Sequence, residues 1–248
     1  MLVPLIYALV AQLDRAPGYE PGGQRFESSP VHCFARAYMI IEKVIAGPCA
    51  TNAYVVISSD TQQAAVIDVP PDSAETILSI LNRYKVLLTH ILLTHSHWDH
   101  IGDVAKLQAK TKAAVFVHPL DADNVRHPGS DGLPLWNPIQ GVTSLEFLNN
   151  VVSVGSLCFT VIEVPGHTPG GVGFFLEKQG VLFSGDTLFK GTMGRVDLPT
   201  SSPEKMWSSL AKFGALPKET KVFPGHGEET TIGQELWIQN ARKRFKTG

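Results

Sequence analysis

Three of the nine histidines of this 248-residue chain fall within residues 94–100, the segment THSHWDH, directly after the short apolar run ILL. A short apolar run bounded by polar residues is typical of a buried strand. Side chains two apart in an extended chain point the same way, so His95 and His97 can bind one cation. Asp99 and His100, beyond the bend, can bind another. The spacing differs from the i, i+4 pair of helical zinc sites and therefore predicts a metal-binding loop at the end of a strand.

Three later segments share one design, in which a strand runs into a tight turn that carries a single ligand-type side chain. Glycine allows the backbone to bend sharply and to approach a site closely, and proline stiffens the turn. Together they predict a site assembled from separate strand ends on a rigid scaffold. The segments are VPGHTPG with His167, SGDT with Asp186, and FPGHG with His226.

The order of predicted elements favours two sheets packed together with helices on the outside. Helices are predicted from Pro71-Asp72 onward, where Asp72 and Glu75 are spaced as a capping box, and over 103–111, 203–215 with Ser202 as N-cap, and 232–244. Strands are predicted over residues 39–45, 54–58, 64–68, 91–93, 114–117, 157–163, 172–176, 181–184 and 221–223.

Length and composition favour one domain, because 248 residues with 44% hydrophobic content bury one substantial core. A net charge of −2 provides no general field for nucleic acid, and three cysteines are too few for a disulfide framework, which favours a reducing, cytoplasmic location. Residues 1–38 have neither a basic leader nor a regular period, and we expect a disordered or mistranslated extension ahead of a hydrolase domain at 39–248. No membrane partner is expected, and the chain is expected to be a monomer or a small homo-oligomer.

The motifs THSHWDH, PGHTPG, SGDTLF and PGHG, in this order, resemble those of the metallo-β-lactamase superfamily, and the resemblance covers residues 39–248. Within that superfamily, the run GDTLFKGTMGRVDLP is most similar to glyoxalase II (hydroxyacylglutathione hydrolase), in a short form without the C-terminal helical domain. The resemblance implies an α/β fold, an αββα four-layer sandwich of two mixed β-sheets with helices on the outer faces.

The resemblance also implies a binuclear centre. Asp186 would bridge the two metals. Asp68 would not bind metal itself but would lie behind the ligands and support them. Neutral imidazoles and carboxylates suit zinc, with iron or manganese as alternatives. The implied ligands are His95, His97 and His167 for one metal and Asp99, His100 and His226 for the other.

The implied reaction is hydrolysis of a small-molecule thioester such as S-lactoylglutathione by a hydroxide that bridges the metals and that Asp99 orients. A thiol of pKa about 8.5 leaves without much protonation, so no separate general acid is required. Lys190 and Arg195 are the predicted substrate contacts. Asp197, near Arg195, would repel an anionic carrier.

Several alternatives stay open at this point. Persulfide dioxygenases of the same superfamily share the motifs and use a single iron, and a lactonase would use the same ligands. A nucleic-acid processing enzyme is disfavoured by the absence of a broad basic face and of room for a nuclease domain. A non-catalytic metal-binding module is disfavoured because structural zinc sites close with four ligands, and seven candidates are present here.

Overall fold

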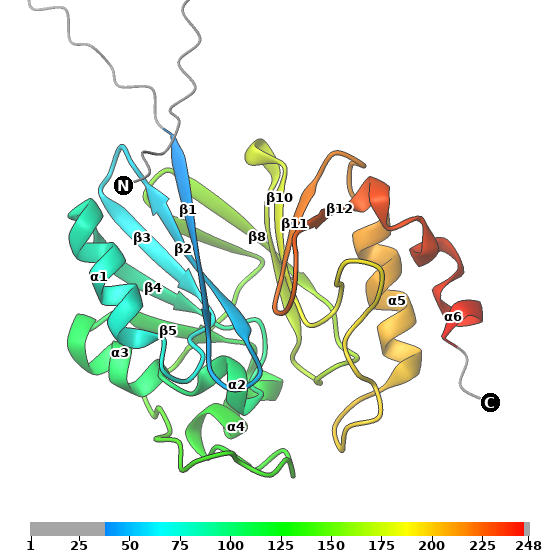
Figure 1. The fold of residues 1–248 in the computed structure, drawn as a ribbon, viewed down its shortest axis with the longest axis horizontal. Coiled ribbons are helices and arrows are strands. Elements are labelled where there is room, and N and C mark those ends of the chain that lie inside the picture. The colour runs from blue at the N-terminus through cyan, green and yellow to red at the C-terminus, as the bar shows by residue number, and fades with distance from the viewer. Residues whose placement is uncertain (1–37, 246–248) are drawn as a thin grey trace, which may run out of the picture. The chain divides into compact units, whose positions relative to one another are not determined.

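Two six-stranded sheets pack face to face with helices on their outer faces in the computed structural model, which describes residues 38–245 (Figure 1). In the first sheet β1 to β3 are antiparallel, and β3 to β6 are parallel. Its strands, in sheet order, are β1 (Met39–Ala46), β2 (Thr51–Ser58), β3 (Gln63–Ile67), β4 (Leu87–Leu92), β5 (Ala114–Val117) and β6 (Glu146–Phe147).

The second sheet is antiparallel except for the pair β10 and β11, which run parallel. Both sheets are therefore mixed, as predicted. Its strands, in sheet order, are β12 (Thr230–Thr231), β11 (Lys221–Pro224), β10 (Val181–Gly185), β9 (Val172–Leu176), β8 (Leu157–Glu163) and β7 (Val151–Val154). The pairs β1/β2 and β7/β8 close each sheet on one side with hairpins.

The helices are short and lie between or outside the strands (Figure 1). The α-helices are α1 (Ala74–Tyr84), α2 (Trp98–Ile101), α3 (Val104–Thr111), α4 (Ala122–Arg126), α5 (Pro203–Gly214) and α6 (Ala241–Arg244). The 3-10 helices are η1 (Pro119–Asp121), η2 (Glu177–Gln179), η3 (Ile232–Gln234) and η4 (Leu236–Asn240).

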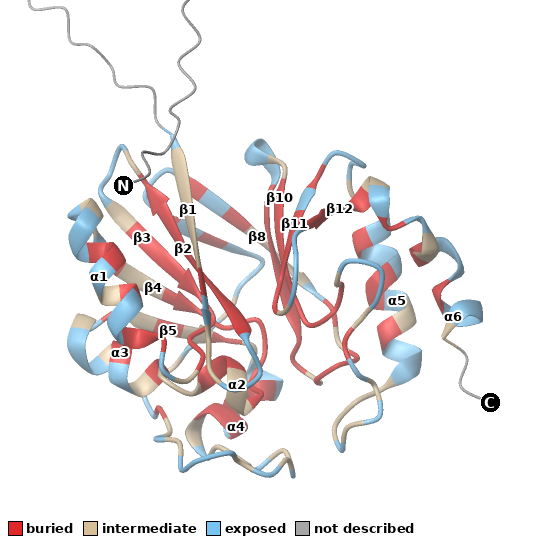
Figure 2. Cartoon of the chain, in the orientation of Figure 1, coloured by how far each residue is buried: buried red, intermediate tan, exposed pale blue. Residues whose placement is uncertain are grey.

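Three hydrophobic cores fill the spaces between four layers, because neighbouring residues of a strand point to opposite faces. On β2, Val55 packs in the core under α1 and α3, while Tyr54 packs between the two sheets. On β10, Phe183 faces the first sheet and Leu182 faces the core under α5. Figure 2 shows the resulting continuous burial of the central strands. The predicted αββα four-layer architecture is confirmed.

The capping box predicted for the first helix is wrong. No side chain of its own caps α1, and Asp72 has a left-handed backbone with φ of 65°. Instead Asp103, the N-cap residue of α3, accepts a hydrogen bond from the Ala74 amide at 3.0 Å. Glu75 pairs with Lys110 at 2.7 Å. The carboxylate of Asp103, which tertiary packing brings to the start of α1, thus caps a free backbone amide of this helix, the role that the local pattern predicted for Asp72.

The helix predicted over residues 232–244 is also replaced, by η3, η4 and α6. The Ile232 amide bonds to the Thr220 carbonyl and the Gly233 amide to that of Lys218. Glu235, with φ −95° and ψ 50°, interrupts the segment, and its buried carboxylate accepts hydrogen bonds from elsewhere in the fold. Hydrogen bonds to residues distant in the sequence therefore prevent the single helix that the apolar periodicity of this segment predicts. Within the described residues, no helix is both long and apolar enough to cross a bilayer.

Candidate metal centre

Four loops at one edge of the sheet pair present the ligand-type side chains. The segment 94–100 follows β4, and the loop before β9 carries His167. Asp186 follows β10 and His226 follows β11; because these strands are parallel and in register at Gly185 and Pro224, the two side chains emerge side by side. The amide of Val172 donates to the carbonyl of Thr94 at 2.8 Å, which joins the two sheets at this edge.

The first cluster consists of His95, His97 and His167, whose ligand atoms all lie within 4.8 Å of one another. All three side chains are buried. Their Nε2 atoms are enclosed and have no hydrogen-bond partner anywhere in residues 38–245. A buried nitrogen without a partner is costly, and three that converge fit the lone-pair donor set of one divalent cation.

The second cluster consists of Asp99, His100 and His226, again with ligand atoms within 4.8 Å of one another. The Nε2 atoms of His100 and His226 are 3.4 Å apart, and Asp99 Oδ2 lies 3.3 Å from His226 Nε2 and 3.6 Å from His100 Nε2. Two imidazoles and one carboxylate around a common point form a second set that suits zinc, iron or manganese.

Asp186 lies between the two clusters. Its Oδ1 is 3.3 Å from His100 Nε2, and its Oδ2 is 3.4 Å from both His167 Nε2 and His226 Nε2. The carboxylate therefore reaches one histidine of the first cluster and two of the second. Such a position would suit a ligand shared by two cations.

Hydrogen bonds on the far side of the rings turn Nε2 toward the centre. The Nδ1 atoms of His167 and His226 contact the carbonyls of Arg195 at 2.7 Å and Cys49 at 3.2 Å, and so carry the proton. His100 Nδ1 lies 2.8 Å from Asp68 Oδ2. Such contacts fix the tautomer and the ring orientation that metal ligands require.

In the metal-free protein the pKa values of the histidines differ between the two clusters. Burial lowers the pKa of His97 to about 3 and lowers that of His95 well below its usual value, so both rings offer a lone pair at neutral pH.

In the second cluster, burial opposes the charge of His226 too, but hydrogen bonds to Asp186 and Asp99 raise its pKa to about 9. Burial would raise the pKa of Asp99, yet His100 and the hydrogen bonds from His226 and Thr51 outweigh it and lower that pKa to about 2. Asp99 is therefore ionised. The donor set as a whole fits two divalent cations.

Gly225 allows the β11 turn to approach the centre. A Cβ at this position would lie 2.1 Å from Asp186 Oδ1 and 2.8 Å from His100 Cε1. We expect Gly225→Ala to displace the Asp186 carboxylate, to reduce the bound metal from two ions to at most one, and to lower activity about a hundredfold. Elemental analysis of the purified variant measures the first effect. Gly214→Ala, in α5, where a Cβ meets only the Ile238 side chain, is the control, and equal metal content in the two variants would refute this role of Gly225.

Asp121 is a buried carboxylate that sequence reasoning missed. Its Oδ2 accepts from the Ser96 amide at 3.0 Å, and its Oδ1 accepts from the Gly170 amide at 2.6 Å. It thereby ties the loop of His95 and His97 to the loop of His167. The sequence HPLD gives no sign of this, because only the fold brings these loops together.

We expect Asp121→Asn to weaken metal binding at the first cluster about 10- to 100-fold, since an amide nitrogen would face a backbone donor and loosen both loops. Competition with a chromogenic chelator measures this affinity. The exposed neighbour Asp123→Asn serves as the control. An Asp121 variant with unchanged affinity would show that the carboxylate does not position these ligands.

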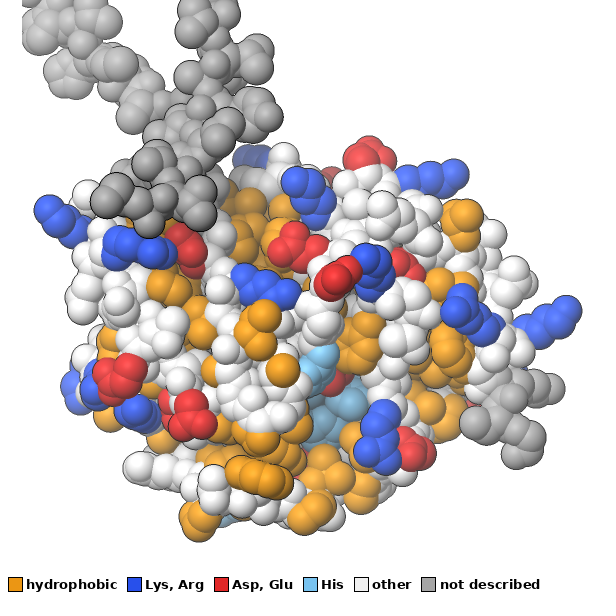
Figure 3. Space-filling model, viewed as in Figure 1, with side chains coloured by type: hydrophobic (Ala, Val, Ile, Leu, Met, Phe, Trp, Pro, Cys, Tyr) orange, Lys and Arg blue, Asp and Glu red, His pale blue; other side chains and the backbone are white. Residues whose placement is uncertain are grey.

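A cleft of about 490 Å³ opens over the two clusters. Figure 3 shows histidine side chains at the floor of a hollow on this face, with hydrophobic side chains beside it. The residues that line it are Cys49, His97, Trp98, Asp99, Leu133, Pro134, Leu135, Trp136, His167, Asp186, Arg195, Leu198 and His226.

The two predicted substrate contacts have different positions. Arg195 lines the cleft, but its guanidinium is paired with both oxygens of Asp197 at 2.9 Å. Lys190 is not among the lining residues; its ammonium pairs with Glu228 at 2.5 Å. The prediction of Lys190 as a substrate contact therefore finds no support in the geometry, because its charge is directed to a neighbouring carboxylate instead.

Comparison with known proteins agrees with this geometry. The family model for the metallo-beta-lactamase superfamily matches residues 46–226. A hydroxyacylglutathione hydrolase of Methylobacterium nodulans is 39% identical over 180 residues, which span 72% of this chain and 64% of the relative, so the match extends over about two thirds of that protein's length.

Two solved structures are similar over nearly their whole length. The BLEG-1 B3 metallo-beta-lactamase has a TM-score of 0.74 and 35% identity, covering 79% of this chain and 96% of that one. TTHA1623, solved in a di-iron-bound form, has a TM-score of 0.68 and 36% identity, covering 78% and 96%. The motifs, the fold and these likenesses together establish that the chain belongs to the metallo-β-lactamase superfamily.

Proposed function

We propose that the chain is a binuclear metal-dependent hydrolase that cleaves small-molecule thioesters. The observation that carries the proposal is the position of Asp186, whose two oxygens lie between a three-histidine cluster and a second cluster of Asp99, His100 and His226. A structural site would be closed by its ligands, whereas this one opens into a cleft large enough for a small substrate. The hydroxyacylglutathione hydrolase relatives support the thioester class.

Two divalent cations, most readily zinc, would lower the pKa of a shared water from about 15.7 to about 7 and stabilise negative charge on a substrate carbonyl oxygen. The residues of the chain supply the rest. Asp99 is ionised and lines the cleft, and Thr51 holds its Oδ2 by a hydrogen bond of 2.8 Å. It can therefore accept a hydrogen bond from the attacking water and orient it toward the carbonyl carbon.

In the reaction, a C–O bond forms between water and the carbonyl carbon, and the C–S bond breaks with its electron pair going to sulfur. Of the two protons of the water, one ends on the departing thiolate and the other passes to solvent, and the products are a carboxylate and a thiol. Because a thiol has a pKa of about 8.5, this leaving group needs no strong acid beside it. The lining residues of the cleft include no lysine or tyrosine that would act as one.

The proposal is tested by assaying the protein with two equivalents of zinc, iron or manganese against S-lactoylglutathione, a neutral thioester, a lactone and glutathione persulfide. We expect thiol release from the thioesters, at least a hundredfold faster than lactone opening. Treatment with a chelator should abolish the turnover, and added metal should restore it. Oxygen consumption on the persulfide with one bound iron, and no thioester turnover, would favour a dioxygenase and overturn the proposal.

A further inference from the structure

We infer that the preferred thioester carries an uncharged apolar or aromatic group, which packs against Trp98 and Trp136, and that glutathione is a poor carrier for it. This inference rests on the thioester hydrolysis proposed above and specifies its substrate class. Three features of the molecule carry it: the wall of the cleft, a cavity beside that wall, and the charges around both.

One wall of the cleft is almost entirely apolar. The loop between α4 and β6 supplies it with a run of four residues, LPLW at 133–136, and Trp98 and Leu198 complete it. The side chain of Trp136 is 68% exposed, so the indole is presented to solvent at the mouth of the cleft rather than buried in a core. Covering such a ring with an apolar ligand removes a large hydrophobic surface from water, at about 25 cal/mol per Å².

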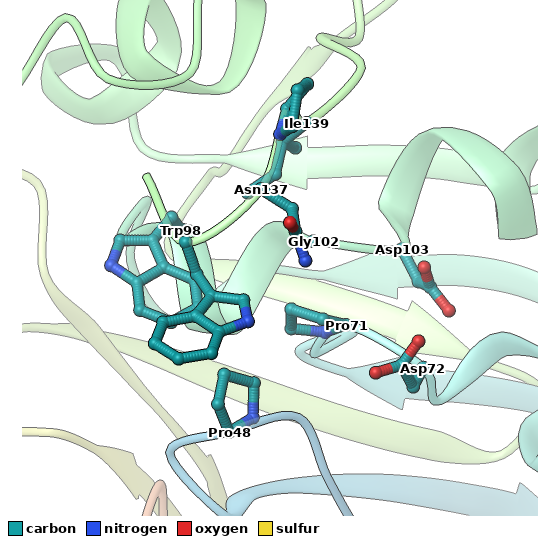
Figure 4. A pocket seen from close by; sticks show the side chains of 10 residues that line it. Pro48, Pro71, Asp72, Trp98, Gly102, Asp103, Asn137 and Ile139 are labelled. Carbon is teal, nitrogen blue, oxygen red and sulfur yellow. The ribbon is translucent and has the colours of Figure 1, made fainter. Parts of the chain in front are cut away.

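A second cavity of about 190 Å³ adjoins the cleft and shares both tryptophans with it. Figure 4 shows Trp98 beside Pro48 and Pro71, with Asp72 and Asp103 on the far side from Trp98. Both tryptophans therefore line both cavities. A substrate whose reacting carbonyl lies over the metal clusters has room for a flat or branched group along this pair of indoles.

The charges around these cavities disfavour an anionic carrier. Asp72 and Asp103 line the second cavity, and neither forms an ion pair with a lysine or arginine of the described chain. At the cleft itself, Asp197 already neutralises Arg195 through two hydrogen bonds. Glutathione has two carboxylates and one ammonium, so it carries a net negative charge, and Arg195, the one lysine or arginine among the described residues that line the cleft, is already paired.

The test compares kcat/KM for three thioesters that differ in one group each. They are the phenylacetyl thioester of N-acetylcysteamine, which is neutral and aromatic, the acetyl thioester of the same thiol, and the phenylacetyl thioester of glutathione. We expect the first to exceed the second at least tenfold, through a lower KM. We expect the glutathione carrier to lower kcat/KM severalfold relative to the neutral thiol.

Two variants test the named contacts. Trp136→Ala should reduce the ratio of phenylacetyl to acetyl kcat/KM at least fivefold; because the residue is largely exposed, folding is preserved. Asp197→Asn should free Arg195 and raise the ratio of glutathione to neutral carrier severalfold. Leu87→Ala, an exposed apolar residue at the start of β4 and outside both cavities, is the control and should change neither ratio.

The outcomes separate this inference from the proposed function. Turnover of all three thioesters with equal kcat/KM, or with the glutathione carrier preferred, would overturn the inference while thioester hydrolysis stands. An unchanged phenylacetyl preference in Trp136→Ala would likewise overturn the role of this wall, even if an apolar substrate is preferred. No turnover of any thioester by the metal-loaded protein would overturn both.

Discussion

Replacing Asp186 with asparagine should lower kcat/KM about a thousandfold and reduce the bound metal from two ions per chain to one or none. The carboxylate contacts histidines of both clusters, so losing its charge and one oxygen acceptor weakens both sites at once. A metal contributes several kcal/mol of charge stabilisation in the transition state, and each 1.36 kcal/mol corresponds to a factor of ten.

Elemental analysis and steady-state kinetics of the Asp186→Asn protein measure the two effects together. The exposed Asp123→Asn provides a control for the loss of one carboxylate elsewhere in the chain. If Asp186→Asn bound two metals and kept its activity within tenfold, Asp186 would not bridge the clusters. Loss of activity with both metals retained would instead restrict its role to the reaction.

The second large effect is expected at Asp68. This buried carboxylate accepts from the Thr94 amide at 2.8 Å and the Thr94 hydroxyl at 2.7 Å, and it faces His100 Nδ1 at 2.8 Å. Asp68→Ala should lower the free energy of unfolding by about 3–5 kcal/mol, because it leaves these buried groups without a partner. Denaturant unfolding of the metal-free protein measures this loss.

Asp68→Asn separates shape from charge. The backbone of Asp68 is left-handed, with φ of 58°, a conformation that asparagine tolerates and alanine does not. We therefore expect the free energy of unfolding of Asp68→Asn to lie closer to that of the parent protein than that of Asp68→Ala does. The asparagine variant should still bind metal about 10- to 100-fold more weakly, because His100 loses the carboxylate that orients it. Equal metal affinity of the parent and Asp68→Asn would contradict this role.

The residues of the candidate centre could be located from the sequence because each lies in a short local pattern. His95, His97, Asp99 and His100 follow one strand within a single loop, and the three turns that follow β8, β10 and β11 each present one ligand beside a glycine. The strands that precede these loops fix where each loop begins. Their convergence then depends only on the sheet topology, which the order of elements and the family resemblance both indicate.

The residues that support the centre could not be found in this way, because each acts on a segment distant in the chain. Asp121 binds amides 25 and 49 residues away. Asp103 caps α1 across the fold in place of Asp72. Glu235 accepts from the Gly191 amide at 2.7 Å and interrupts a segment whose local pattern predicts a helix.

The pairing of Lys190 could not be predicted for the same reason. A lysine close to a metal-binding motif was predicted to contact substrate, but the β11 turn brings Glu228 to within 2.5 Å of its ammonium. The pairing of Arg195 with Asp197 is local, only two residues apart, and could have been anticipated. Of the two pairs, only that of Arg195 lies at the cleft, where it bears on the carrier inferred above.

Anomalous diffraction from crystals of the protein soaked in zinc or manganese tests the central claim most directly. The account predicts two peaks roughly 3.5–4 Å apart, one among His95, His97 and His167 and one among Asp99, His100 and His226, with Asp186 between them. A single peak, or two peaks away from these side chains, would contradict it.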